Sequence, residues 1–310
     1  MKKLILPTLC ILLLLACRKD TFTDSPEAYL STIDSLHFDT VFTSTGSVSQ
    51  IFKIVNENEE GIRVNSVRLA GGAASPFKIN VDGKPGPLVN NLEIKAKDSI
   101  YVFVTVTSDP NTANLAFLVQ DSIEINYNGK TQWVQLDAFG QNAHFFRNRI
   151  ITGTETWNND LPYVILGGLV VDTNAVLNIN KGSRIHMHAD APFIIHGTLN
   201  VNGEKWDSTR VIFTGDRLDE PYRNFPASYP GLIFTDVSKD NVLQYAIIKN
   251  AFQGIIVDQP STNLSPKLIL NEVIIDNSYD AGIIGINTSI DTRNLLVSNC
   301  GKNIQLVSGG

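Results

Sequence analysis

Residues 215–230 bring together the side chains that a sugar-binding groove requires. The candidate binding residues in and just before this stretch are Trp206, Arg217, Tyr222, Arg223, Phe225 and Tyr229. Aromatic rings offer flat apolar faces on which a sugar ring stacks, and guanidinium groups hydrogen-bond to its oxygens. The structural alternative is a loop folded over a sheet, in which the rings cover apolar surface and the prolines stiffen the chain. Both interpretations are consistent with the sequence.

The same stretch holds three acidic residues, Asp216, Asp219 and Glu220. Hydrolysis of a glycosidic bond requires two carboxyl groups roughly 5–9.5 Å apart. Because these acids fall within one loop and no carboxylates recur on successive strands, we predict a non-catalytic chain with no catalytic residue and no cofactor. A polysaccharide-active enzyme, with its catalytic residues in this loop or outside the sequence, is the alternative.

Three histidines are the candidate metal ligands. His186 and His188 alternate with Ile185 and Met187, so in a strand both imidazoles leave the same face, about 7 Å apart. A zinc site requires a third protein ligand, and His196 is the only candidate. We therefore predict exposed strand histidines and no metal site.

Short apolar pairs at positions i and i+2 define the elements that carry these side chains. The pairs recur every six to twelve residues and are mostly separated by Gly, Asn or Asp: Leu169/Val171, Leu177/Ile179, Ile185/Met187, Phe193/Ile195, Leu199/Val201 and Val211/Phe213. Strands of three to five residues at this spacing fit the faces of a parallel β-helix, in which each coil stacks on the last.

Internal repeats in the last 70 residues support the same fold. Three similar segments end in Asn250, Asn277 and Asn299, which are 27 and then 22 residues apart. This spacing predicts a coil of 20 to 30 residues. Asparagine tolerates a left-handed backbone, and stacked amides hydrogen-bond along a solenoid. A structural asparagine ladder is therefore the expected role of the three residues.

Residues 163–310 resemble the right-handed parallel β-helix proteins of the pectate-lyase-like superfamily. The residues that carry this resemblance are 175–179, 181–185, 195–203 and 211–215. The superfamily includes lyases, hydrolases, epimerases and non-catalytic adhesins, so the resemblance implies a fold and no single activity. Its lyases typically use an acidic cluster that holds calcium, with an Arg or Lys base. The expected outward residues are scattered: Lys249, Gln253, Asp276, Asp280 and Lys302.

Residues 36–140 predict a β-sandwich. Alternating or continuous apolar runs at 50–55, 62–69 and 100–106 are separated by turn signals, among them Asp82-Gly83 and Asn128-Gly129. The segment resembles the hydin-type immunoglobulin-like domains of bacterial surface proteins, on the strength of residues 38–42, 52–56 and 76–79. The resemblance implies a spacer or binding module.

The amino terminus predicts export. Lys2 and Lys3 precede an apolar run of about a dozen residues, which is shorter than the roughly 20 that span a bilayer. The run closes with Leu14-Leu15-Ala16-Cys17, which resembles the lipobox of bacterial lipoproteins. The resemblance implies cleavage after residue 16, diacylglycerol on Cys17 and a further acyl chain such as palmitate, which together give stable anchoring. We expect the outer membrane, facing either the periplasm or the cell surface.

Composition limits the remaining possibilities. The 25 Lys and Arg residues form no block and the net charge is −6, so a nucleic-acid partner is not expected. With Cys10 in the signal and Cys17 lipidated, only Cys300 remains, and we expect it to be a buried thiol without a disulfide partner. The last repeat ends at Gly310 without a polar cap, which predicts that the natural chain continues or that a partner covers that end.

The sequence therefore predicts an all-β chain in five parts. These are a signal peptide (1–16), a lipidated tether (17–35), an immunoglobulin-like sandwich (36–140), a junction (141–162) and a right-handed parallel β-helix (163–310) that is truncated at its end. The expected function is that of a cell-envelope lipoprotein acting as a non-catalytic adhesive or glycan-binding scaffold. Its expected partners are the membrane, through the lipid, and a polysaccharide or another surface protein.

Overall fold

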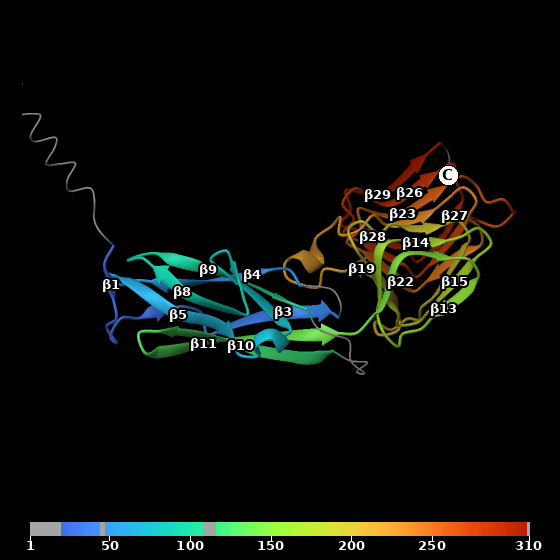
Figure 1. The fold of residues 1–310 in the computed structure, drawn as a ribbon. Coiled ribbons are helices and arrows are strands. Elements are labelled where there is room, and N and C mark those ends of the chain that lie inside the picture. Colours follow the sequence, from blue (N-terminus) through green and yellow to red (C-terminus); the bar gives the residue numbers. More distant parts are fainter. Residues whose placement is uncertain (1–19, 44–46, 108–115, 309–310) are drawn as a thin grey trace, which may run out of the picture. The chain divides into compact units, whose positions relative to one another are not determined.

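The computed structural model describes residues 20–43, 47–107 and 116–308 (Figure 1). Apart from two three-residue 3-10 turns, its regular elements are all strands. A first compact unit ends at Gly140 and a second begins at Gln141. The predicted signal peptide and Cys17 lie outside the described residues. Within the described part of the chain, no helix is long and apolar enough to cross a membrane.

The first unit consists of two mainly antiparallel sheets. The first sheet contains β1 (Phe22–Thr23), β5 (Gly61–Leu69), β10 (Phe117–Tyr127), β11 (Lys130–Gln141), β3 (Ser35–Phe42) and β8 (Leu88–Ile94). The second contains β2 (Leu30–Ser31), β4 (Gln50–Asn56), β9 (Ser99–Val106), β6 (Phe77–Val81) and β7 (Lys84–Pro85). Inward residues of both sheets form one apolar core. In β9, for example, Ile100, Val102 and Val104 are buried while Tyr101 and Phe103 are exposed.

The two predicted glycine turns are hairpins. Asp82 and Gly83 have φ of 50° and 80°, and Asn128 and Gly129 have φ of 46° and 73°. Two successive positive φ angles are the signature of the type I′ turn, whose twist matches that of the flanking strands. The sequence pattern therefore located both turns.

The structure differs from the predicted tether over residues 20–35. Strand β1 pairs in parallel with β5, and β2 pairs with β4. Leu30 is fully buried, and its backbone N–H donates to the Tyr127 hydroxyl at 3.2 Å. This stretch is therefore part of the sandwich. Strands of two residues are too short to show any periodicity, which is why the sequence pattern missed them.

The second unit is a parallel β-helix of about seven turns, with three faces. Face 1 contains β13 (Thr154–Trp157), β15 (Val176–Asn180), β18 (Thr198–Asn202), β21 (Asn241–Gln244), β24 (Leu268–Asn271) and β27 (Ile290–Arg293). Face 2 contains the first part of β14 (Tyr163–Val171), then β16 (Arg184–Met187), β19 (Val211–Gly215), β22 (Ala246–Lys249), β25 (Ile274–Asp276) and β28 (Leu296–Ser298). Face 3 contains the second part of β14, then β17 (Phe193–Ile195), β20 (Leu232–Phe234), β23 (Gln253–Asp258), β26 (Ala281–Ile286) and β29 (Lys302–Val307). The predicted fold class, a sandwich followed by a parallel β-helix, is confirmed.

The predicted junction at 141–162 belongs to the β-helix. Strand β12 (His144–Ile151) pairs in parallel with β14, and β13 pairs in parallel with β15. In this first coil Phe146 packs against Trp157 and Tyr163, with ring centroids 5.4 and 6.1 Å apart. Aromatic and arginine side chains at the end of the solenoid replace the small apolar alternation of the inner coils. The β-helix predicted from the sequence therefore starts one coil too late.

Coil length locates the main insertion. Residues paired in register on face 1 are 22 apart for Val176 and Thr198, and 22 apart for Ile269 and Asp291. These spacings confirm the predicted coil length. Between Asn200 and Val242 the spacing rises to 42. Most of the excess is the segment 216–231, which joins β19 on face 2 to β20 on face 3.

Candidate functional site

The segment 216–231, which we name the corner loop, lies at the corner between faces 2 and 3. The Asn250 side chain donates to the Arg223 carbonyl at 2.8 Å, and the Asn277 side chain donates to the Asn224 carbonyl at 2.8 Å. Asn250 and Asn277 belong to the next two coils. The loop therefore extends along the corner past its own coil, over two strand spacings of about 4.8 Å each.

The three repeat asparagines all occupy the turn at this corner. Asn250, Asn277 and Asn299 have left-handed φ angles of 66°, 57° and 53°. The Asn277 side chain donates to the Asn250 side-chain oxygen at 2.8 Å. The Asn299 side chain instead donates to Asp276 at 2.8 Å. The amides therefore link the coils to each other and to the corner loop.

Two charged pairs lie in the loop, and one of them contacts the Tyr222 ring. The Arg217 guanidinium donates twice to Asp219, at 2.6 and 2.7 Å, and lies 4.1 Å from the centroid of the Tyr222 ring. These hydrogen bonds lower the pKa of the Asp219 carboxyl. Arg223 pairs with Glu220. The Tyr222 and Phe225 rings meet edge to face, with centroids 5.3 Å apart, and both are nearly half exposed.

Tyr229 does not belong to this exposed surface, contrary to the prediction. Its ring is part of the β-helix core, and its backbone bridges to Ala251 on the next coil. Its hydroxyl has no hydrogen-bond partner among the described residues. Burial raises the pKa of the Tyr229 phenol well above its usual range. Tyr229 closes the base of the loop.

Because that hydroxyl is buried and unpaired, we expect Tyr229→Phe to stabilise the β-helix. Leaving a buried hydroxyl without a partner costs about 1–3 kcal/mol, so its removal should increase the free energy of unfolding by about 1 kcal/mol. The measurement is the guanidinium midpoint of the variant against wild type. A lower midpoint would show that the hydroxyl makes a stabilising hydrogen bond.

Trp206 is exposed but lies elsewhere. It belongs to the turn between β18 and β19, at the corner between faces 1 and 2, with the Lys205 ammonium 4.5 Å from its ring centroid. The five residues of β19 separate this turn from the corner loop by about 16 Å. The structure therefore does not bring Trp206 together with Tyr222 and Phe225.

Two aromatic residues at the corner were not predicted as site residues from the sequence. Phe252 and Tyr279 lie on successive coils with ring centroids 5.7 Å apart and planes inclined by 21°, and both are exposed. Each follows its corner asparagine, Asn250 or Asn277, by two residues. Equal positions in successive repeats lie one above the other in a solenoid, so the sequence contains a signal for this pair.

The histidines do not converge. His188 bonds to the Asp216 carboxylate at 2.7 Å and His196 to the Thr235 hydroxyl at 2.9 Å. His186 is buried, contrary to the prediction of an exposed side chain, and its Nδ1 lies 3.2 Å from the Gly215 carbonyl. Burial raises the pKa of Asp216, and the bond to His188 partly opposes that rise. In the described ranges no three His, Cys, Asp or Glu side chains are placed to share a metal ion.

Lys267 is a buried charged residue that the sequence did not indicate. Its side chain is fully buried just before β24, and its ammonium donates to the carbonyls of Thr235, Asp236 and Asp258 at 2.7–2.8 Å. Burial lowers the pKa of this ammonium, although Asp236 and Asp258 partly offset the shift. The arrangement links the turns between faces 3 and 1 on successive coils. It is a structural cross-link without an approach for a ligand.

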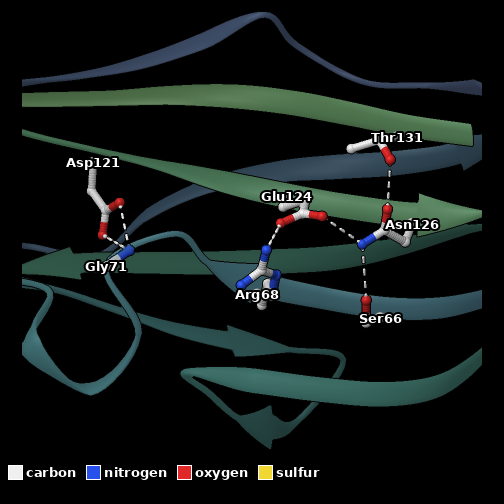
Figure 2. A network of polar contacts seen from close by, with 7 residues as sticks. All are labelled: Ser66, Arg68, Gly71, Asp121, Glu124, Asn126 and Thr131. Atoms are coloured by element: carbon white, nitrogen blue, oxygen red, sulfur yellow. Dashed lines mark hydrogen bonds and ion pairs between the residues drawn. The ribbon is translucent and has the colours of Figure 1, made fainter.

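Figure 2 shows a polar network on β5, β10 and β11 of the sandwich. Arg68 pairs with Glu124, and the Asn126 amide donates to Glu124 at 2.8 Å and to Ser66 at 3.2 Å. The Thr131 hydroxyl donates to Asn126 at 2.7 Å. These side chains satisfy one another across neighbouring strands. The network therefore fixes strand register rather than presenting groups to a ligand.

Comparison with known proteins does not identify a family. No family model matches the chain, and no curated protein matches it. Among solved structures, a family 123 glycoside hydrolase from Clostridium perfringens, described for glycolipid glycan hydrolysis, aligns with 12% identity and a TM-score of 0.28. The alignment covers 41% of this chain and 26% of that one, so the chain spans about a quarter of the hydrolase structure.

Proposed function

We propose that the chain is a cell-envelope lipoprotein, anchored through lipid on Cys17, whose β-helix binds a glycan without catalysis. The observation that carries this proposal is the exposed ring pair of the corner loop. The Tyr222 and Phe225 rings meet edge to face, and the Arg217 guanidinium lies over the Tyr222 ring while Asp219 holds that guanidinium. Rigid rings that remain exposed lose little conformational entropy when a sugar stacks on them.

The rest of the chain supports presentation of that surface. The sandwich lies between the lipidation site and the β-helix in the sequence and acts as a spacer. The lipid holds the chain on the outer membrane. Cys17→Ser should abolish incorporation of labelled palmitate and release the protein from membranes, and protease treatment of intact cells should show which leaflet carries it.

Replacement of the loop rings should weaken glycan binding. We expect Tyr222→Ala to raise the dissociation constant about fivefold, because loss of a well-packed aromatic contact costs about 1 kcal/mol and 1.4 kcal/mol is tenfold. A glycan array on the full chain finds the ligand, and calorimetry measures the affinity. The matched control is Tyr101→Ala on the sandwich, since Tyr101 is 44% exposed and Tyr222 46%. Equal affinity of Tyr222→Ala and the control would contradict the proposal.

One observation favours the enzymatic alternative. Asp216, at the base of the loop, has a pKa raised by burial and bonds to His188. A carboxyl group with a raised pKa is one feature that a general acid requires. Release of reducing ends from the bound glycan, lost in Asp216→Asn, would establish that function instead.

A further inference from the structure

A second pair of exposed rings, Phe252 and Tyr279, lies at the same corner on the next two coils, and we name it the ring platform. We propose that Phe252 and Tyr279, with Gln253, Asp280 and Lys302 beside them, form a subsite for a neutral pyranose that continues the surface of the corner loop. The inference deepens the proposed function and rests on it: it assigns a second site and the chemical class of the glycan.

The ring platform leaves one face of the Tyr279 ring without a stacking partner. Phe252 and Tyr279 stack on each other, and Tyr279 is 63% exposed. The next coil places Gly301 at this corner, where its N–H donates to the Ser278 carbonyl at 3.2 Å. A Cβ on Gly301 would lie 2.5 Å from the Tyr279 carbonyl oxygen, so the position does not accept a side chain. Tyr279 therefore has a ring neighbour on one side and none from the following coil.

Hydrogen-bonding groups lie directly beside the rings. The Gln253 amide donates to one Asp280 carboxylate oxygen at 2.7 Å, and the Lys302 ammonium lies 3.8 Å from the other. Lys302 also donates to the Gln305 side-chain oxygen at 3.1 Å. A carboxylate, an amide and an ammonium in contact provide both acceptors and donors for neighbouring hydroxyl groups. Apolar stacking with a few placed polar groups is the usual composition of a ligand site.

The platform is continuous with the corner loop. The Phe252 N–H donates to the Tyr229 carbonyl at 2.7 Å, and the Ser228 N–H donates to the Asn250 carbonyl at 2.9 Å. Asn277, two residues before Tyr279, donates to the Asn224 carbonyl between Tyr222 and Phe225. The two ring pairs are thus fixed to one backbone framework. A glycan of several units lying along the corner would meet both.

The charges indicate a neutral ligand. Three cations of this surface each have a carboxylate partner: Arg217 with Asp219, Arg223 with Glu220 and Lys302 with Asp280. The chain as a whole carries a net charge of −6. A polyuronate would therefore meet neutralised cations and a protein of its own sign, whereas hydroxyl groups require no net charge.

Calorimetry of the full chain with neutral hexasaccharides (gluco-, manno- and xylo-configured) and with polygalacturonate tests the inference. We expect binding of a neutral oligosaccharide, a dissociation constant about fivefold higher in Tyr279→Ala and a several-fold rise in Asp280→Asn. The matched control is Trp206→Ala, because Trp206 is also 63% exposed but lies at another corner. Melting temperatures verify that each variant is folded.

The outcomes separate this subsite from the proposed function. If Tyr222→Ala weakens binding while Tyr279→Ala behaves like Trp206→Ala, the subsite is overturned and the loop site stands. If the chain binds polygalacturonate and none of the neutral sugars, the ligand class is overturned while glycan binding stands. If wild type binds no glycan, or if no ring variant weakens binding, both proposals fail.

Discussion

Lys267→Met should destabilise the β-helix by about 3 kcal/mol, because three hydrogen bonds from a charged donor are lost and each contributes about 1 kcal/mol or more. The Lys267 ammonium donates to three carbonyls, those of Thr235, Asp236 and Asp258. Methionine has a similar length and apolar character, so it fills the space of the side chain but donates nothing. The substitution therefore isolates the loss of the three hydrogen bonds from the loss of packing.

The cost should be large because the acceptors are backbone groups at a corner between coils. A buried carbonyl that loses its partner costs about 1–3 kcal/mol. Thr235 and Asp236 follow β20 and Asp258 ends β23, so the ammonium joins two coils that are consecutive along face 3. Without it, each turn must recruit water or change conformation. Local opening at this corner should accompany the lower global stability.

Guanidinium unfolding measures the effect, and hydrogen exchange of β20 and β23 locates it. The matched control is Lys239→Met, because Lys239 lies in the same turn region and is exposed. A substitution there should change stability by no more than about 0.5 kcal/mol. If both variants unfold at the wild-type midpoint, the buried ammonium contributes no net stability.

The fold was predictable where the signal is local. Alternation in β4, β5 and β9 follows from one buried and one exposed side of each strand, and both type I′ turns follow from Asp-Gly and Asn-Gly. The coil rhythm follows in the same way from inward residues such as Leu177 and Ile179, which are fully buried. Two-residue strands such as β1 and β2 carry no such signal, because their position depends on pairing with β5 and β4.

The candidate site was predictable in part. Composition singled out the corner loop, but it could not separate Tyr222, which is exposed, from Tyr229, which is in the core. That difference depends on the bridge between Tyr229 and Ala251 on the next coil. Trp206 shows that proximity in sequence does not predict proximity in space, since it is near the loop in sequence but one strand away from it in the structure. Phe252 and Tyr279 share a repeat position, which is a readable signal.

Buried polar residues are the least predictable class. Lysine is almost never fully buried unless it is paired, and the acceptors of Lys267 lie 9, 31 and 32 residues earlier in the chain. His186 alternates with the core residues Ile185 and Met187 and therefore points outward, yet it is buried beside Gly215 of the next coil. Alternation identifies which side of a strand a residue occupies and not what covers that side.

The burial of His186 makes the stability of the β-helix depend on pH. Burial lowers the pKa of His186 from 6.5 to about 4, the nearby charges of Arg184 and Lys249 act in the same direction, and the Gly215 carbonyl partly opposes them. The unfolded chain binds a proton below pH 6.5 that the folded chain does not accept until about pH 4. The stability contributed by neutral His186 is therefore complete above pH 6.5 and is lost as the pH falls to about 4.

We expect this loss to reach about 3 kcal/mol at pH 4, since one unit of pKa shift corresponds to about 1.4 kcal/mol. His186→Gln, which retains a side-chain donor for Gly215 but does not titrate, should be less stable than wild type at pH 7 and should gain on it as the pH falls. Guanidinium midpoints of both proteins at pH 7, 5.5 and 4 measure the difference. The folded pKa of Asp216 is raised and that of Asp219 is lowered. Both residues are present in wild type and variant, so their contributions cancel in the comparison. A difference that stays constant from pH 7 to pH 4 would mean that His186 takes up its proton in the folded β-helix as readily as in the unfolded chain.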